Sequence, residues 1–171
     1  MVAAWPEAVE RVSSFLREAG AEARIEEFAG GTPTAADAAA AVGCELAQIV
    51  KTLVLFCDDG PVVALVPGDR RCDLKKVARA TGTEHARVAT AKEVTDVAGV
   101  GPGAVAPFPL PRVDAVFVDR SLLRHKLVWA GAGSPHHIMG LPPAELVRLA
   151  KARPVDVVED AAYDSPETKE S

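Results

Sequence analysis

Three segments of this sequence carry residue types that could do chemistry. Lys51 stands between a short predicted helix and an apolar strand, and Gly103 lies in a run of glycines and prolines, 99–107. A third run, Gly-Ala-Gly-Ser-Pro-His-His, begins at Gly131. A lysine at such a junction can hold a carboxylate, a phosphate or a developing oxyanion, and glycine backbone lets a ligand reach exposed N–H groups. The pattern therefore indicates a site for an anion or for developing negative charge.

Each of these segments also has a simpler structural interpretation. A lysine beside an apolar strand often only carries its ammonium group to the surface, and a Gly/Pro run is often a connector. The run 99–107 is not a Walker loop, because no Gly-Lys-Ser/Thr follows it. It also lacks the strand and helix that flank a dinucleotide-binding fingerprint. The sequence alone leaves both interpretations open.

Metal-ion and nucleophilic chemistry are poorly supported. His136 and His137 are neighbours on a predicted strand, so they point to opposite faces, and no carboxylate or cysteine lies nearby in sequence. We therefore expect no metal site, with one histidine facing a pocket or held as a structural residue. Ser134 lies in a predicted turn without a Gly-x-Ser-x-Gly elbow. The cysteines are widely spaced, as expected for reduced thiols, and none is favoured as a nucleophile: Cys44, Cys57 and Cys72.

Basic residues gather in two groups that could bind a polyanion or simply form solvated faces. The first group, which we predict to bind a polyanionic ligand, is Arg70, Arg71, Lys75, Lys76 and Arg79. The second group is Arg120, Arg124, His125 and Lys126.

The elements that must position these residues follow from the hydrophobic pattern of a chain of 171 residues, 49 % hydrophobic and 25 % charged. That length suits one domain with a sizeable core, and no apolar run is long enough to cross a membrane. Capping signals and helical spacing predict helices at 6–19, 35–43, 45–50, 74–81, 91–99 and 144–151. Apolar and β-branched runs predict strands at 24–28, 52–57, 61–66, 113–118, 127–130, 136–141 and 155–158. Interleaved helices and strands with hairpin turns favour an α/β domain of the α+β type with a largely antiparallel sheet.

Four segments in order carry a resemblance to a known family. They are TAADAAAAVGCELAQIVKTLVL (34–55), VPGDRRCDLKKV (66–77), GVGPGAVAPF (99–108) and VWAGAGSPHHIMGL (128–141). Together they make the chain similar to the YbaK-like aminoacyl-tRNA deacylases, which are related to the editing domain inserted in bacterial prolyl-tRNA synthetases. The resemblance implies one domain over residues 1–159 with a curved, barrel-like mixed sheet flanked by helices. Residues 160–171 are expected to form a polar, disordered tail.

The resemblance also implies which residues form the site. Lys51 would be the main functional residue, and the glycine of a Gly-x-x-x-Pro motif falls on Gly103, with Pro107 closing the motif. Gly131 and Gly133 would border the same pocket. Some relatives carry an acidic residue and others a histidine near the position of His137, so its role stays open. The expected substrate-binding set is Thr52, Pro107, Gly131, Gly133, Ser134 and His137.

The function implied by this resemblance is hydrolysis of the ester between a wrong amino acid and the 3′ end of a tRNA. We expect a trans-editing deacylase acting on Ala- or Cys-charged tRNA(Pro), without metal or cofactor, in the cytoplasm. Its partners would be the tRNA acceptor end and, as a further candidate, a prolyl-tRNA synthetase. The alternative is a non-catalytic module that binds an aminoacyl or nucleotide ligand and regulates a synthetase or another partner, because no acid/base pair is recognisable.

The net charge of −5 argues at first against a polyanionic partner. Its distribution changes that conclusion. Residues 1–30 hold six acidic and three basic residues, and residues 156–171 hold six and one. The body, 31–155, holds twelve acidic and fifteen basic residues. The segment that contains Lys51 and both basic groups is therefore mildly positive, which predicts weak, salt-sensitive binding to a tRNA end.

Overall fold

The computed structural model describes residues 5–58 and 60–160, and the expected tail beyond residue 160 lies outside the described residues. The helices of this part are α1 (Glu7–Glu18), α2 (Ala35–Val42), α3 (Leu74–Thr81), α4 (Ala91–Ala98) and α5 (Pro143–Ala150). Two 3₁₀ segments accompany them, η1 (Leu46–Gln48) and η2 (Arg120–Arg124). The strands are β1 (Arg24–Glu27), β2 (Ile49–Cys57), β3 (Gly60–Pro67), β4 (Ala86–Val88), β5 (Ala115–Asp119), β6 (Val128–Ser134), β7 (His137–Leu141) and β8 (Arg153–Val155).

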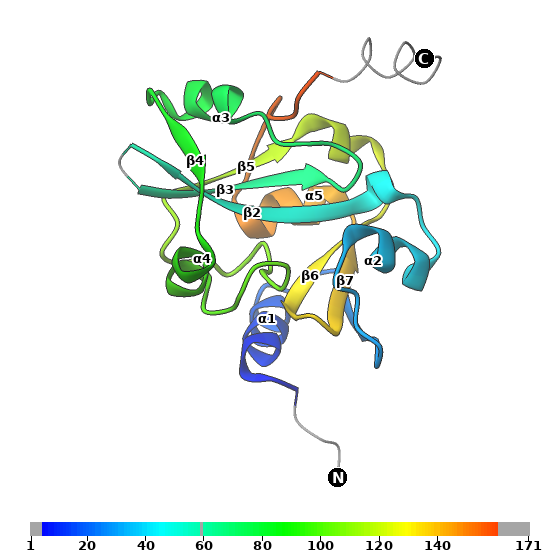
Figure 1. Cartoon of the computed structure of the whole chain (residues 1–171). Helices are drawn as coiled ribbons and strands as arrows, with labels where there is room; N and C mark the ends of the chain where they lie inside the picture. Colours follow the sequence, from blue (N-terminus) through cyan, green and yellow to red (C-terminus); the bar gives the residue numbers. More distant parts are fainter. Residues whose placement is uncertain (1–4, 59, 161–171) are drawn as a thin grey trace.

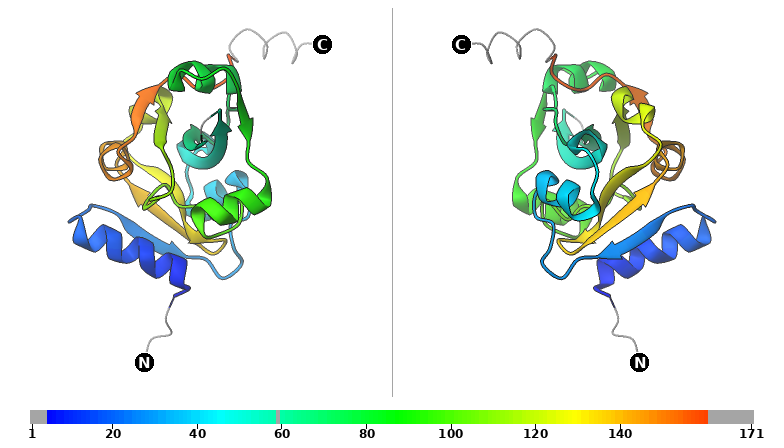
Figure 2. Two further views of the ribbon diagram at one scale, coloured as in Figure 1. Left: turned by 90° about the vertical axis from the view of Figure 1, so that its left-hand side faces the viewer. Right: turned by 90° about the vertical axis from the view of Figure 1, so that its right-hand side faces the viewer.

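The described strands form one mixed sheet in the order β1-β7-β6-β2-β3-β5-β8, with β4 added to β2 (Figure 1). Four of the seven strand pairings are antiparallel, and β2–β6, β3–β5 and β5–β8 are parallel. The sheet curves around an interior, and α1 lies outside it beside β1 (Figure 2). Within the described residues β1 and β8 do not pair, so the sheet is curved but not closed. The predicted single α/β domain with a mixed sheet is confirmed.

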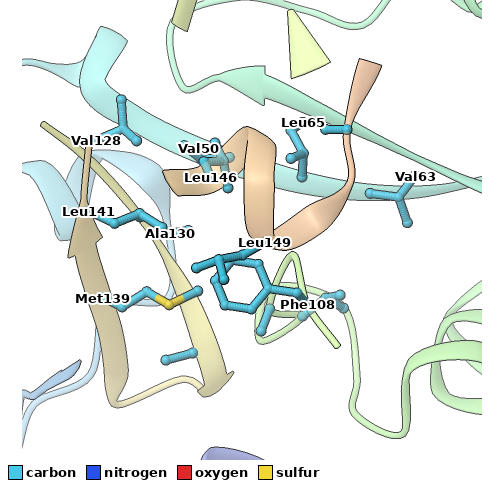
Figure 3. Close-up of a cluster of buried hydrophobic side chains, with 14 of the residues drawn as sticks. Val50, Val63, Leu65, Phe108, Val128, Ala130, Met139, Leu141, Leu146 and Leu149 are labelled. Carbon is cyan, nitrogen blue, oxygen red and sulfur yellow. The ribbon is translucent and has the colours of Figure 1, made fainter. Parts of the chain in front are cut away.

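The main core fills the concave side of the sheet. Leu146 and Leu149 of α5, and Phe108 directly after the Gly/Pro run, pack against Met139 and Leu65 of the strands (Figure 3). β3 is buried on both faces, because Val63 and Leu65 join this core while Val62, Ala64 and Val66 join a second one. The second core is closed by Val77 of α3 and by Val157 and Val158. The continuous apolar run of β3 is therefore explained by helices and loops on both sides of the sheet.

Helix starts follow the predicted caps. The side chains of Thr34, Asp73 and Thr90 accept backbone N–H bonds at the starts of α2, α3 and α4. Gly43, Gly82 and Gly99 end the same three helices in the left-handed conformation. Capping chemistry is local in sequence, which is why these boundaries are predictable.

Other predicted boundaries were wrong where a pairing partner decides them. The expected helix at 45–50 shortens to η1, because Ile49 and Val50 pair in parallel with Trp129 and Ala130 and so begin β2. Most of the expected turn at 131–135 is strand, because β6 runs to Ser134 and leaves only Pro135 and His136 in the turn. β6 passes through a register shift that the small residues at 131–133 permit. The last strand is β8 rather than 155–158, and neither β4 nor η2 was predicted.

None of the helices in the described ranges has the length and hydropathy needed to cross a bilayer.

Candidate active site

A pocket opens where β2 and β6 separate. The two strands pair only at Ile49 and Val50. Farther along the same edge, β2 is paired again from Leu55 onward, with β4. Lys51, Thr52 and Leu53 therefore have no strand partner on this edge within the described residues. This gap is covered by α2 and by the segment that carries Gly103, and the enclosed volume is about 220 Å³.

Six of the predicted site residues line this one pocket although they come from four separate parts of the chain. They are Lys51, Thr52, Gly103, Gly131, Ser134 and His137. The remaining walls were not predicted from the sequence: they come from 32–35 and Ala38, from the apolar residues of β2, and from Val105, Trp129, Ala130 and Ile138. The aromatic and aliphatic walls with a few polar groups are typical of a small-ligand site.

Lys51 is half-buried at the rim of the pocket. Its Nζ donates a hydrogen bond to the Arg70 carbonyl oxygen at 2.6 Å. Burial lowers the pKa of Lys51 from its ordinary value, while Asp69 and Cys72 act in the opposite direction. Because a lysine ammonium has three N–H donors, two of them stay available to a ligand.

Two buried polar atoms at this pocket lack hydrogen-bond partners. They are Thr52 Oγ1 and His137 Nε2, and no other buried side-chain nitrogen or oxygen of the described residues is unpaired in this way. An unsatisfied buried polar atom costs about 1–3 kcal/mol, so native proteins rarely keep one without a use. Both atoms belong to residues that line the same cavity, which favours a polar ligand there.

His137 is held on several sides. The residue is 2 % exposed, its Nδ1 lies 2.6 Å from Ser134 Oγ, and the Trp5 ring meets the imidazole edge-on with the ring centroids 5.3 Å apart. Ser134 Oγ already accepts the His136 N–H, so its hydroxyl hydrogen can go to Nδ1, which leaves the ring hydrogen on Nε2. Nε2 faces the Glu27 carboxylate at 3.6 Å.

Burial lowers the pKa of His137, and Glu27 only partly offsets this effect. The imidazole is therefore neutral at neutral pH. Sequence reasoning missed Glu27 and Trp5, because β1 and the residues before α1 reach His137 only through the β1–β7 pairing and the packing of the chain start. His136, expected on the same strand as His137, lies in the turn before β7, with Nδ1 3.0 Å from the Phe28 carbonyl oxygen.

Gly103 has a φ of +88°, which favours glycine, and a Cβ built there would have only the Pro33 carbonyl oxygen within 4.0 Å. A side chain at this position would thus enter open space along the pocket wall. A Cβ on Gly131 would lie 3.2 Å from the Val105 carbonyl oxygen, so this glycine allows two backbone segments to approach closely. Both glycines place backbone rather than side chain at the wall.

Two residues of the expected binding set lie elsewhere. Pro107 lines a different hollow, with Phe15 and Leu149. Gly133 packs against α1, where a Cβ would come within 2.9 Å of the Ala8 backbone. Its φ of +107° belongs to the β6 register shift. Gly133 thus meets a helix rather than the cavity, a distinction that only the packing reveals.

The basic residues predicted to bind tRNA lie outside the pocket lining. Topology still brings them near it, because β2 starts where β3 and β5 end, and the segments after β3 and β5 carry the two basic groups. Lys75 and Arg79 are exposed on α3. Lys76 instead pairs with Asp156 and Asp160, so its charge is already matched within the protein.

The described residues contain no cluster of three or more His, Cys, Asp or Glu side chains that could hold a metal ion. The titratable side chains that line the pocket in this part of the chain are Lys51 and His137. Such a site can bind an anion or carbonyl through an ammonium and offer a neutral imidazole and a hydroxyl to a polar ligand.

Comparison with known proteins shows the family to which this chain belongs. The family model described as "Aminoacyl-tRNA editing domain" matches residues 29–149, which include every residue that lines the pocket. Trp5 and Glu27, which contact His137, precede the matched range. The chain belongs to the aminoacyl-tRNA editing domain family. The expected resemblance to YbaK-like deacylases and synthetase editing domains is thereby confirmed.

Three members show the range of this family. A proline–tRNA ligase of Streptococcus sanguinis is 29 % identical over 89 % of this chain, which spans only 26 % of that ligase. EbsC of Enterococcus faecalis, described as a candidate Cys-tRNA(Pro)/Cys-tRNA(Cys) deacylase, is 26 % identical over 70 % of this chain and 74 % of its own. A crystal structure of a candidate trans-editing enzyme for prolyl-tRNA synthetase superposes with a TM-score of 0.85, at 34 % identity, over 92 % of this chain and 100 % of that one.

Proposed function

We propose that this protein is a trans-editing deacylase that hydrolyses the ester of mischarged tRNA, with Ala- or Cys-charged tRNA(Pro) as the substrate. Membership of the editing family gives the reaction class. The observation that carries the proposal to this site is the pair of unpaired buried atoms, Thr52 Oγ1 and His137 Nε2, in the pocket with Lys51 and Gly103. The named relatives support the choice of tRNA(Pro).

The proposed reaction needs little catalytic machinery, because an aminoacyl ester is already activated. Lys51 holds the terminal phosphate or the ester carbonyl as a cation, and the backbone N–H at Gly103 stabilises the oxyanion. Water attacks the carbonyl carbon, the ester C–O bond breaks, and the ribose oxygen leaves with a proton. Tight apolar walls, including Ile49 and Trp129, limit the side chain that enters.

Proton transfer in this mechanism is assigned to the substrate. No carboxylate lines the pocket in the described part of the chain. The vicinal ribose 2′-hydroxyl, next to a 3′ ester, can relay the proton from the attacking water. A tRNA with a terminal 2′-deoxyribose is therefore expected to be deacylated at least about tenfold more slowly, and an unchanged rate would exclude this step.

The tRNA contact is assigned to the two basic groups that flank the Lys51 end of the sheet. Exposed residues of these groups include Arg71, Arg120 and Arg124. Binding through such contacts weakens as salt rises. An affinity that does not change between 50 and 200 mM salt would contradict this assignment.

A panel of charged tRNAs tests the function directly. tRNA(Pro) charged with Ala, Cys, Ser or Pro is incubated with the wild-type protein and with Lys51→Ala, and ester loss is followed. We expect rapid loss of Ala or Cys, retention of Pro, and dependence on Lys51. Absence of hydrolysis for every substrate, with binding retained, would instead identify the non-catalytic module.

A further inference from the structure

The last described residues of the chain, 156–160, lie across the segment that leads into α3, and we call them the C-terminal strap. Backbone bonds join the two segments: the Asp73 N–H donates to the Val157 oxygen and the Glu159 N–H donates to the Arg71 oxygen, both at 2.8 Å. The Val157 N–H donates to Asp119 Oδ1 at 3.0 Å, and Val158 is almost fully buried. The strap lies outside the residues that the family model matches.

Lys76 of α3 bonds to the strap through its ammonium group. Its Nζ contacts both Asp156 carboxylate oxygens at 3.0 and 3.1 Å, Asp160 Oδ1 at 2.9 Å and the Val158 oxygen at 2.7 Å. The Lys76 side chain is only 16 % exposed. These acceptors raise the pKa of Lys76, so the ammonium group persists over the working pH range. One cation thus joins three points of a five-residue segment.

Arg70 links the strap to the proposed active site. The Arg70 guanidinium donates to the Glu159 carbonyl oxygen at 2.5 Å, and the Arg70 carbonyl oxygen accepts from Lys51 Nζ at 2.6 Å. Arg70 and its neighbours are therefore fixed by the strap on one side and meet the pocket lysine on the other.

We propose that the strap, clamped by Lys76, is a positioning device that holds the Arg70 carbonyl where it orients the Lys51 ammonium toward the pocket. The proposal rests on the proposed function of Lys51. A lysine side chain has four flexible bonds and loses substantial rotamer entropy when it is fixed. If the Arg70 carbonyl already fixes the ammonium group, part of this entropy is lost before the substrate binds. Small errors in the position of a catalytic group lower the rate strongly. Lys76 is then a positioning residue and not a tRNA contact.

Two kinds of variant separate these roles. Lys76→Met removes the clamp cation, and the double variant Asp156→Asn/Asp160→Asn removes its partners. Lys76→Arg is the conservative rescue, and Lys92→Met, which removes an exposed lysine paired with Asp96 on α4, is the matched control. If the strap positions Lys51, both clamp variants lower the single-turnover rate at saturating protein at least about fivefold, with KM within about twofold. Lys76→Arg then restores most of the rate, and Lys92→Met does not lower it.

The tRNA-contact alternative predicts the opposite pattern. Lys76→Met would then raise KM, and removing the carboxylates would strengthen tRNA binding, because a masked cation is released. Either of these results overturns the proposal, as does an unchanged rate in both clamp variants. The Asp156→Asn/Asp160→Asn variant is decisive, because the strap model predicts a slower reaction and the tRNA-contact model predicts tighter tRNA binding.

A readout without substrate keeps the test independent of the deacylase function. A hydrogen-bonded lysine ammonium gives an observable ¹H–¹⁵N NMR correlation, and we expect that of Lys51 to be lost in the clamp variants and kept in Lys92→Met. Amide exchange at Asp73 and Glu159 is expected to accelerate about tenfold in the same variants. If the Lys51 signal persists with unchanged exchange, the strap does not position Lys51; if it is lost while no tRNA is deacylated by any form, only the proposed function fails.

Discussion

The pocket and the strap region lie on either side of Lys51 and differ in whether their polar side-chain atoms have hydrogen-bond partners. In the strap region Lys76, Arg70 and Asp119 all have partners within the chain. At the pocket Thr52 Oγ1 and His137 Nε2 are buried and unpaired. A region that serves the fold gains stability by satisfying its polar groups, whereas a binding site keeps donors and acceptors for its ligand. The contrast teaches that Lys51 lies between the two regions: its Nζ is bonded to the Arg70 carbonyl oxygen, and its remaining N–H donors are available to the pocket.

The largest effect expected from this comparison is on Lys51. Lys51→Ala removes the pocket cation, and deacylation should fall by about 10²–10³-fold, the usual loss when a group stabilising an oxyanion is removed. Its melting temperature should change little, because the side chain is half-buried with one hydrogen bond. Initial rates on charged tRNA and a thermal melt measure both. Lys92→Ala, on exposed α4, is the control, and full activity in Lys51→Ala would falsify the site assignment.

Gly103 gives the next largest effect. Valine there should reduce activity at least about tenfold, because its side chain enters the pocket space. Alanine shares the unfavourable φ, which costs about 1–2 kcal/mol, without the same bulk. We expect Gly103→Ala to retain much more activity than Gly103→Val, measured beside stability in urea. Gly101→Val, in open space without a positive φ, should be nearly normal; equal activity of all three variants would contradict the pocket wall.

Two threonines allow a direct comparison of a hydroxyl without a hydrogen-bond partner, at the pocket, and a hydroxyl with one, on α3. Thr52→Val removes an unpaired hydroxyl, so stability should stay the same or rise slightly while deacylation falls several-fold. Thr81→Val, on α3, removes a hydroxyl that donates to the Ala78 oxygen at 2.9 Å. This change should cost about 1 kcal/mol of stability and leave activity unchanged. Urea unfolding and initial rates test both, and the same response from both threonines would remove the distinction between the regions.

The smallest expected effect is the pH dependence of stability at His137. Its pKa is lowered in the folded state, so the unfolded chain binds the proton more readily. The stability contribution of neutral His137 is therefore present above the ordinary pKa of about 6.5 and is lost as pH falls below it. His137→Gln should lose less stability than wild type between pH 7.5 and 5.5 in urea unfolding. Equal losses in both would show that His137 does not titrate in this way.

Much of the candidate site was predictable from residue type together with the family resemblance. Lys51, Thr52, Gly103, Gly131, Ser134 and His137 were singled out and lie around one cavity. Sequence spacing could not show that Gly133 faces α1, or that Lys76 is already paired. Each of these outcomes depends on a residue more than 50 positions away, or on packing against another element, and no local pattern encodes it.

By itself the sequence determined the caps of α2, α3 and α4, the β2–β3 hairpin and the family of the chain, because these features depend on neighbouring residues and on motif order. Only the tertiary structure decided where the pocket forms, since it arises from the separation of β2 and β6 after two paired residues. Tertiary contacts also decided which polar groups are paired. Partners for Lys76 and Lys51 come from distant segments that only the closed chain brings within hydrogen-bond distance.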